Sequence, residues 1–181
     1  MEHVERWSAV RAPDDVFPAY RGTPIERLLL YHNQQRPLER CDRPQILIGM
    51  CMDYRKHLRI PEDFAYILRS GGANLRPSEF KVSFAIAVGG VRAIALIGHD
   101  QCGMVDLTSK EEVFVQGLVD VGWDAEKARG HFRAFAPHFE IGDEIGFLRE
   151  EAVRLRGRYP KVVVAPLLYR LDDDLLYLVR E

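Results

Sequence analysis

Short apolar runs alternate with helical patterns along most of the chain. Four runs have the character of strands, and turn or polar residues bound each of them: residues 45–49, 64–68, 93–97 and 161–165. Unbroken apolar runs of this length are typical of strands that are buried on both faces of a parallel sheet. Near the C-terminus, three aspartates at 172–174 predict the turn of a β-hairpin whose second arm is residues 175–179.

The segments between these strands predict helices. Thr23, Pro24 and Glu26 suit the first turn of a helix as a capping box with proline at the first position, and this helix should stop before Pro37. A second capping box, formed by Thr108 and Glu111, predicts a helix that runs toward residue 120. Further helical patterns cover residues 78–88, 124–136 and 143–157.

This alternation of strands and helices predicts an α/β fold with a mainly parallel central sheet, flanked by helices and completed by a C-terminal β-hairpin. Residues 1–22 are irregular, mixing proline and glycine with charged and aromatic residues, and they predict an N-terminal arm. Residues 23–181 should then form a single α/β domain, which is an ordinary size for one hydrophobic core.

Composition and charge exclude several functional classes. The formal net charge is -2, which does not favour nucleic-acid binding, and the arginine-rich tract 149–158 contains Glu150 and Glu151, so it predicts the solvated face of a helix instead. No window reaches the ~18 apolar residues that a membrane span requires, and the charged N-terminus lacks the apolar core of a signal peptide. We therefore expect a cytoplasmic protein. Its three cysteines are an odd number in a chain without a secretion signal, which argues against a disulfide framework. They should therefore be buried, reactive or metal-bound.

Residues with metal-binding side chains follow two of the predicted strands. Cys51 comes directly after the first strand, and His99 and Cys102 follow the third. Because the carboxyl ends of parallel strands meet at one edge of a sheet, these side chains are expected to converge. Two thiolates and one imidazole suit zinc, and three protein ligands leave one position open, as in catalytic zinc sites. Asp53 and Arg55 lie two residues apart beside the first cysteine and predict a carboxylate–guanidinium pair.

Three sequence blocks together resemble the signature of the β-carbonic anhydrases. In chain order they are Cys51-x-Asp53-x-Arg55, Arg69-Ser70-Gly71-Gly72 and Gly98-His99-x-x-Cys102-Gly103. The resemblance extends over roughly residues 23–180 and is weak between 105 and 160. It implies the α/β fold already predicted, with an N-terminal helical arm, and an enzyme that hydrates carbon dioxide reversibly to bicarbonate by a zinc-bound hydroxide.

The resemblance also implies a role for each matching residue. Zinc would be held by Cys51, His99 and Cys102, while Asp53 and Arg55 would form the catalytic dyad, with Arg55 keeping Asp53 ionised. Three glycines would belong to the substrate-binding region, namely Gly71, Gly72 and Gly103. The family assembles through its N-terminal arms, so we expect a homodimer or a larger homo-oligomer.

Other functions are compatible with the same motifs. Carbonyl sulfide and carbon disulfide are linear molecules related to carbon dioxide, and the same zinc site would hydrolyse them. A zinc-binding protein without activity, which binds an anion or a partner, is a further alternative. A thiol redox protein is disfavoured because Cys51 and Cys102 do not form a Cys-x-x-Cys motif.

Overall fold

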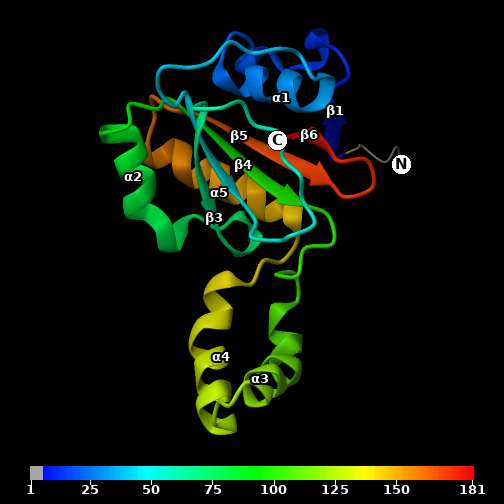
Figure 1. The fold of residues 1–181 in the computed structure, drawn as a ribbon, viewed down its shortest axis with the longest axis vertical. Coiled ribbons are helices and arrows are strands. Elements are labelled where there is room, and N and C mark those ends of the chain that lie inside the picture. The colour runs from blue at the N-terminus through cyan, green and yellow to red at the C-terminus, as the bar shows by residue number, and fades with distance from the viewer. Residues whose placement is uncertain (1–5) are drawn as a thin grey trace.

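The computed structural model describes residues 6–181 and confirms the predicted α/β fold (Figure 1). Its sheet has the strand order β1–β6–β5–β4–β2–β3, with β3, β2, β4 and β5 parallel to one another and β6 and β1 antiparallel to their neighbours. Within residues 6–181 the strands are β1 (Trp7–Ala9), β2 (Ile46–Met50), β3 (Ala65–Arg69), β4 (Ala93–His99), β5 (Val163–Arg170) and β6 (Leu175–Val179).

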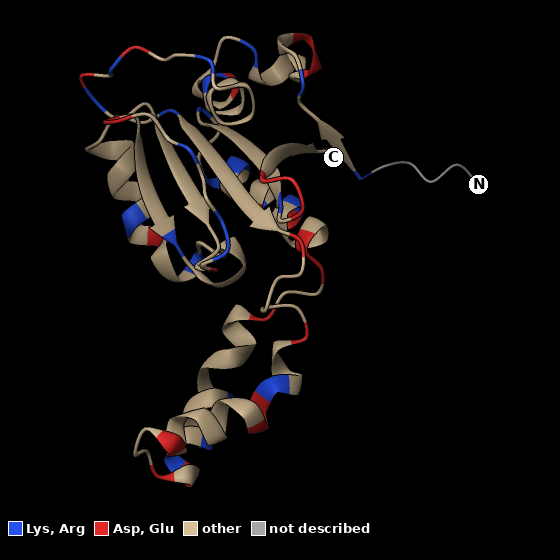
Figure 2. Cartoon of the chain, turned by 45° about the vertical axis from the view of Figure 1, so that its right-hand side comes forward, with Lys and Arg blue, Asp and Glu red and all other residues tan. Residues whose placement is uncertain are grey.

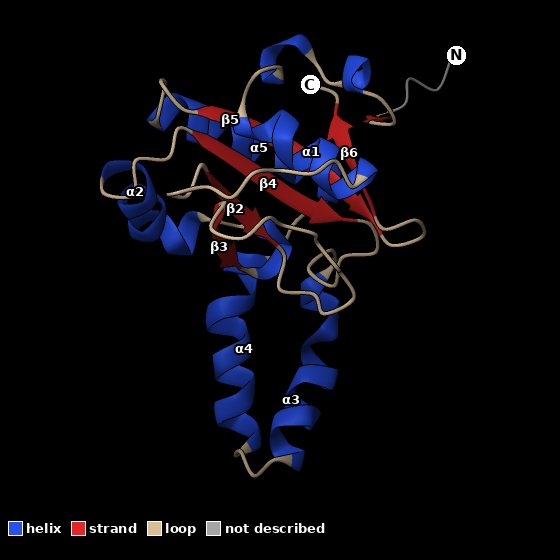
Figure 3. Ribbon diagram, turned by 45° about the horizontal axis from the view of Figure 1, so that its top comes forward, coloured by secondary structure: helices blue, strands red, loops and turns tan. Residues whose placement is uncertain are grey.

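Helices cover both faces of this sheet. They are α1 (Pro24–Gln34), α2 (Glu79–Ala87), α3 (Glu111–Asp120), α4 (Ala125–Phe139) and α5 (Glu144–Arg158). Helix α1 packs on one face, and α2 and α5 pack on the other, whereas α3 and α4 form a hairpin that projects away from the sheet (Figures 1 and 3). Within residues 6–181, no helix is both long and apolar enough to cross a membrane.

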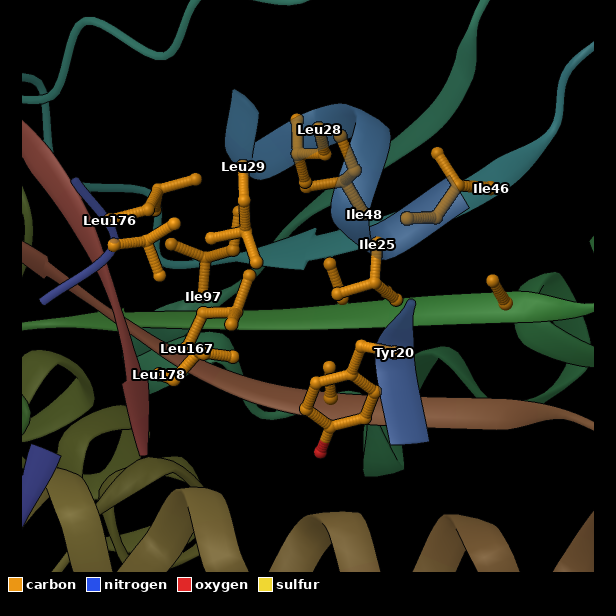
Figure 4. Close-up of a cluster of buried hydrophobic side chains, with 14 of the residues drawn as sticks. Tyr20, Ile25, Leu28, Leu29, Ile46, Ile48, Ile97, Leu167, Leu176 and Leu178 are labelled. Carbon is orange, nitrogen blue, oxygen red and sulfur yellow. The ribbon is translucent and has the colours of Figure 1, made fainter. Parts of the chain in front are cut away.

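Strand residues alternate between the two apolar layers. On the α1 face, the helix residues Ile25, Leu28 and Leu29 contact strand residues that include Ile46, Ile48 and Ile97 (Figure 4). On the opposite face, Leu47, Ile94 and Leu96 pack with Leu148, Ala152 and Leu155 of α5. Burial on both faces explains why the central strands are apolar along nearly their whole length, up to polar residues such as His99 at their carboxyl ends.

The predicted N-terminal arm packs closely on the rest of the chain. Trp7–Ala9 pairs antiparallel with β6, so this part is a strand at the sheet edge. Val16 and Tyr20 are buried in the apolar layer beneath α1. Much of the apolar surface of the arm is therefore covered within the chain, and its first five residues lie outside the described part.

One predicted helix start is confirmed and another is wrong. The Thr23 hydroxyl caps α1 by accepting from the Ile25 N–H. By contrast, Thr108 does not cap α3, because a 3-10 turn, Leu107–Lys110, precedes the helix and Lys110 occupies the capping position without a side-chain hydrogen bond. The Thr108 N–H donates to the Glu140 carboxylate instead. The Glu111 side chain is engaged elsewhere, in ion pairs across the α3–α4 hairpin.

The α3–α4 hairpin is joined by charged side chains. Arg129 on α4 contacts Glu111 at 2.7 Å and Glu112 at 2.6 Å on α3, and Arg133 contacts Glu111 at 2.9 Å. Figure 2 shows acidic and basic positions together on this projecting part of the molecule. The hairpin therefore has a defined pairing of its two helices, although it lies outside the layers that cover the sheet.

A buried histidine connects α1 to two loops near the carboxyl edge of the sheet. The Nδ1 atom of His32 accepts from the Arg59 N–H at 3.0 Å, so Nε2 carries the proton and donates to the Asp174 carbonyl at 2.8 Å. The Tyr169 hydroxyl donates to the Asp174 carboxylate and accepts from the His57 N–H. A second proton on His32 would break its bond with Arg59.

We expect this histidine to make folding pH-dependent. Burial is the main reason why the pKa of His32 is lowered in the folded protein, against about 6.5 in an unfolded chain. The neutral form is thus favoured by folding, and its stabilisation is complete above about pH 6.5 and decreases as the pH falls toward the folded-state value. Urea unfolding should therefore show that the free energy of unfolding decreases less between pH 8 and pH 5.5 for His32→Gln than for the unsubstituted protein. Equal losses in both proteins would contradict this assignment.

Candidate metal centre

Three potential metal ligands converge at the carboxyl edge of the sheet. Met50 of β2 lies beside Ile97 of β4 in parallel register, so the loops after these strands leave the sheet together. Cys51 begins the first loop, His99 ends β4, and Cys102 follows three residues later. One ligand atom from each of these three lies within 4.8 Å of the others, and all three residues are buried. The predicted convergence of these side chains is thus present in the fold.

The histidine of this cluster has a nitrogen free for a metal ion. Its Nδ1 lies 2.8 Å from the Asp100 carbonyl oxygen, so Nδ1 carries the hydrogen and donates it. The other nitrogen, Nε2, is buried and has no hydrogen-bond partner within residues 6–181. An unpaired buried polar atom is costly, and coordination of a metal ion by this lone pair would remove the cost. The residues present therefore fit a zinc ion.

The two sulfur atoms have a matching separation. Cys51 Sγ and Cys102 Sγ are 3.9 Å apart, and two sulfurs bound at about 2.3 Å to a tetrahedral zinc would be separated by about 3.8 Å. The hydrogen bond between the thiols lowers the pKa of Cys51 and raises the pKa of Cys102. Backbone N–H groups of Asp53 and Gly72 further favour the Cys51 thiolate, which is the form that binds zinc.

The predicted carboxylate–guanidinium pair lies next to this cluster. Arg55 donates from Nη2 to Asp53 Oδ2 at 2.8 Å and from Nε to Oδ1 at 3.0 Å, and its backbone N–H also contacts Oδ1 at 2.9 Å. These bonds from Arg55 are the main reason why the pKa of Asp53 lies far below its usual range. Asp53 Oδ2 is 3.7 Å from His99 Nε2, and Arg55 also donates to the Gln101 carbonyl. The pair therefore joins both ligand-bearing loops and keeps a charged carboxylate at the site.

The three predicted substrate-binding glycines have different surroundings. Gly71 and Gly72 follow β3 near Cys51, where a side chain would collide with Met104 and Ile141, and Gly72 has a φ of +62°. At Gly103, an added Cβ would meet only the Lys110 ammonium among the described residues, at 3.9 Å. The left-handed backbone therefore favours glycine at position 72, a side chain at 71 would require Met104 to move, and position 103 has room for one.

An apolar cavity of about 310 Å³ adjoins the ligand-bearing loops. Met52 and Met104 line it from the two loops, and Phe114, Phe135 and Phe139 contribute aromatic rings from the α3–α4 hairpin. No motif in the sequence indicates this cavity, because the hairpin lies between residues 105 and 160, where the resemblance to the family is weak.

Two further polar side chains of the site were not predicted. Glu144, at the start of α5, accepts from the Cys102 N–H at 3.1 Å and so anchors the second loop. Lys56 is 4% exposed, and burial lowers its pKa. Lysine is ordinarily an exposed residue, so nothing in the local sequence distinguishes Lys56 from other lysines.

Comparisons with known proteins agree on the fold. No known family model matches the sequence, and no curated protein matches it significantly. Among solved structures, β-carbonic anhydrase isoform I from Trichomonas vaginalis has a TM-score of 0.63 at 17% identity, over 81% of this chain and 90% of that one. A carbonic anhydrase from Glaciozyma antarctica has a TM-score of 0.58 at 23% identity, over 75% of this chain and 83% of that one.

A structure described as the apo form of carbon disulfide hydrolase is also similar. Its TM-score is 0.55 at 17% identity, over 87% of each chain. Each of the three similarities covers at least three quarters of this chain. This chain therefore has the fold of the β-carbonic anhydrases.

Proposed function

We propose that this protein is a zinc-dependent enzyme that hydrates carbon dioxide reversibly to bicarbonate. The observation that carries the proposal is the buried cluster of Cys51, His99 and Cys102, with an unpartnered His99 Nε2 and a charged carboxylate beside it. In this proposal Cys51, His99 and Cys102 hold the metal, and Asp53 and Arg55 are catalytic. Similarity in fold to carbonic anhydrases supports the assignment.

The metal ligands, the Asp53–Arg55 pair and the apolar cavity have different roles in the proposed reaction. Zinc, when bound, would act as a Lewis acid that lowers the pKa of its water to about 7. The Asp53 carboxylate, kept ionised by Arg55, accepts a hydrogen bond from the nucleophile and orients its lone pair toward the carbon atom of the substrate. The apolar cavity beside the loops accommodates an uncharged substrate and offers little to a charged product.

Stopped-flow measurement of carbon dioxide hydration tests this proposal directly. We expect protein that contains about one zinc per chain to hydrate carbon dioxide with a kcat/KM above ~10⁴ M⁻¹s⁻¹, the lower end of ordinary enzyme efficiency. The rate should rise with pH between 6.5 and 9, as the acidity of a metal-activated water requires. Zinc-loaded protein with no activity over the spontaneous reaction would contradict the proposed reaction.

The apolar cavity also supports hydrolysis of carbon disulfide as a second candidate function. Methionine and phenylalanine side chains line the cavity, and sulfur-containing, uncharged molecules suit such surfaces. The structural similarity to a carbon disulfide hydrolase points the same way. Release of hydrogen sulfide from carbon disulfide by the zinc-loaded protein, without carbon dioxide hydration, would favour this second reaction.

A further inference from the structure

A buried lysine lies directly behind the loop that carries the first metal ligand. Lys56 follows Cys51 by five residues, and its whole side chain is turned into the protein, with 4% of the residue exposed. Lysine is almost never buried to this extent unless its charge is paired, because desolvation of an ammonium group is costly. The position of its ammonium group therefore calls for a specific explanation.

The ammonium group binds main-chain oxygens of the ligand loop. Lys56 Nζ lies 3.0 Å from the carbonyl oxygen of Cys51 and 3.4 Å from that of Asp53. Within residues 6–181 it forms no ion pair with a carboxylate side chain. The Asp53 carboxylate is engaged by Arg55 instead. The loop is thus gathered around one buried cation, which holds the residues on either side of Met52 in a fixed relation.

The charges that face Lys56 belong largely to the metal centre. Cys51, Asp53 and Cys102 are the negatively ionisable groups close enough to favour its charged form, while Arg69 of β3 opposes it. Because the ammonium group contacts the main chain of Cys51 at 3.0 Å, thiolates of the cluster would be in the field of a cation that the protein supplies. A buried cation is stabilised by such anions, and it stabilises them in return.

We propose that Lys56 is a positioning residue of the metal centre, which fixes the Cys51–Asp53 segment in its ligand-binding geometry and offsets the charge of the thiolates. The proposal rests on the zinc site proposed above. It predicts that the free-energy cost of burying the Lys56 ammonium group is offset by tighter binding of zinc. A lysine with a purely structural role would contribute to folding alone and would leave the affinity for zinc unchanged.

Zinc affinity of the metal-free protein, measured by competition with a chromophoric chelator, separates these two roles. Lys56→Met retains the apolar stem of the side chain and removes the ammonium group. We expect it to bind zinc about 10–100-fold more weakly, the range seen when groups that support metal ligands are removed. Lys56→Arg, which keeps a cationic donor, should recover most of the affinity. Lys127→Met is the matched control, because Lys127 is exposed on α4, far along the chain from the cluster.

Chelator competition also distinguishes failure of this inference from failure of the proposed function. Unsubstituted protein that binds no zinc would refute the zinc site itself. Unsubstituted protein that binds zinc, together with Lys56→Met of equal affinity and only a lower unfolding midpoint, would overturn the role of Lys56. If Lys56→Met does not fold, Lys56→Gln takes its place, since it keeps a donor but no charge. Affinity equal to that of Lys56→Arg would then overturn the charge-based role.

Discussion

Replacing Cys51 with alanine is expected to weaken zinc retention strongly and to abolish carbon dioxide hydration. Cys51 is one of three buried residues whose ligand atoms lie within 4.8 Å of one another. Structural zinc sites with four ligands bind with about 10–16 kcal/mol, so an equal share for one thiolate is roughly 2.5–4 kcal/mol. Its loss should therefore weaken zinc binding by about 10²–10³-fold. Zinc per chain after dialysis and the hydration rate are the two measurements.

Cys41→Ala is the matched control for this substitution. Cys41 is also a buried thiol, 8% exposed, but it lies in the apolar layer beneath α1 and outside the metal cluster. The same chemical change should therefore leave zinc content and activity intact, whatever its small effect on stability. Equal zinc affinity in Cys51→Ala and Cys41→Ala would show that the cluster does not hold the metal.

The location of this cluster could be predicted because strand topology determines it. Cys51 and His99 each lie where an apolar strand ends, and two adjacent parallel strands bring their carboxyl ends to one edge. The register Met50–Ile97 then places both loops side by side. The apolar pattern places both residues at the ends of parallel strands, whereas the direct pairing of β2 with β4, with β3 on the other side of β2, is seen only in the folded chain.

The extent of β5 could not be predicted from the same pattern. The apolar run suggests an end at residue 165, and Pro166 cannot donate a hydrogen bond within a ladder. In the structure β5 nevertheless continues to Arg170, with Pro166 beside Leu96 of β4. Pairing with β6 begins only at Leu167, so the missing N–H does not interrupt a bond on that side. Tertiary context therefore decides where this strand ends.

The burial of Lys56 and the apolar cavity could not be predicted from the sequence either. The cavity depends on contacts between segments distant in sequence, because the loop after β2 meets the hairpin of α3 and α4 there. Lys56 contacts carbonyl oxygens only three and five residues away, but its burial is a property of the folded chain that the local sequence does not indicate. The free lone pair on His99 Nε2 likewise depends on the backbone, because Nδ1 donates to the Asp100 carbonyl. No pattern of side chains in the sequence indicates the direction of that carbonyl. Motifs thus locate the ligands, whereas the supporting groups emerge only from the folded chain.

Asp53→Asn is expected to separate zinc binding from catalysis. The substitution keeps the size of the side chain and removes its charge, so the group no longer accepts hydrogen bonds through two anionic oxygens. Because Arg55 keeps the pKa of Asp53 far below its usual range, the carboxylate is charged throughout the pH range of the assay. We expect zinc content to remain near one per chain and kcat/KM to fall by about 10²–10⁴-fold, as when a positioned proton acceptor is lost.

Asp63→Asn provides a control with the same chemistry at a remote ion pair. Its carboxylate contacts Arg40 at 2.8 Å and is half-exposed, so the substitution removes an aspartate–arginine pair outside the metal centre. Activity should be unchanged in that variant, because an exposed pair contributes little to stability. Nearly equal kcat/KM values for Asp53→Asn and the unsubstituted protein would mean that Asp53 takes no part in the reaction, and that its bond with Arg55 serves only to join the two loops. A loss confined to Asp53→Asn, with zinc retained, would assign the carboxylate to the chemical step.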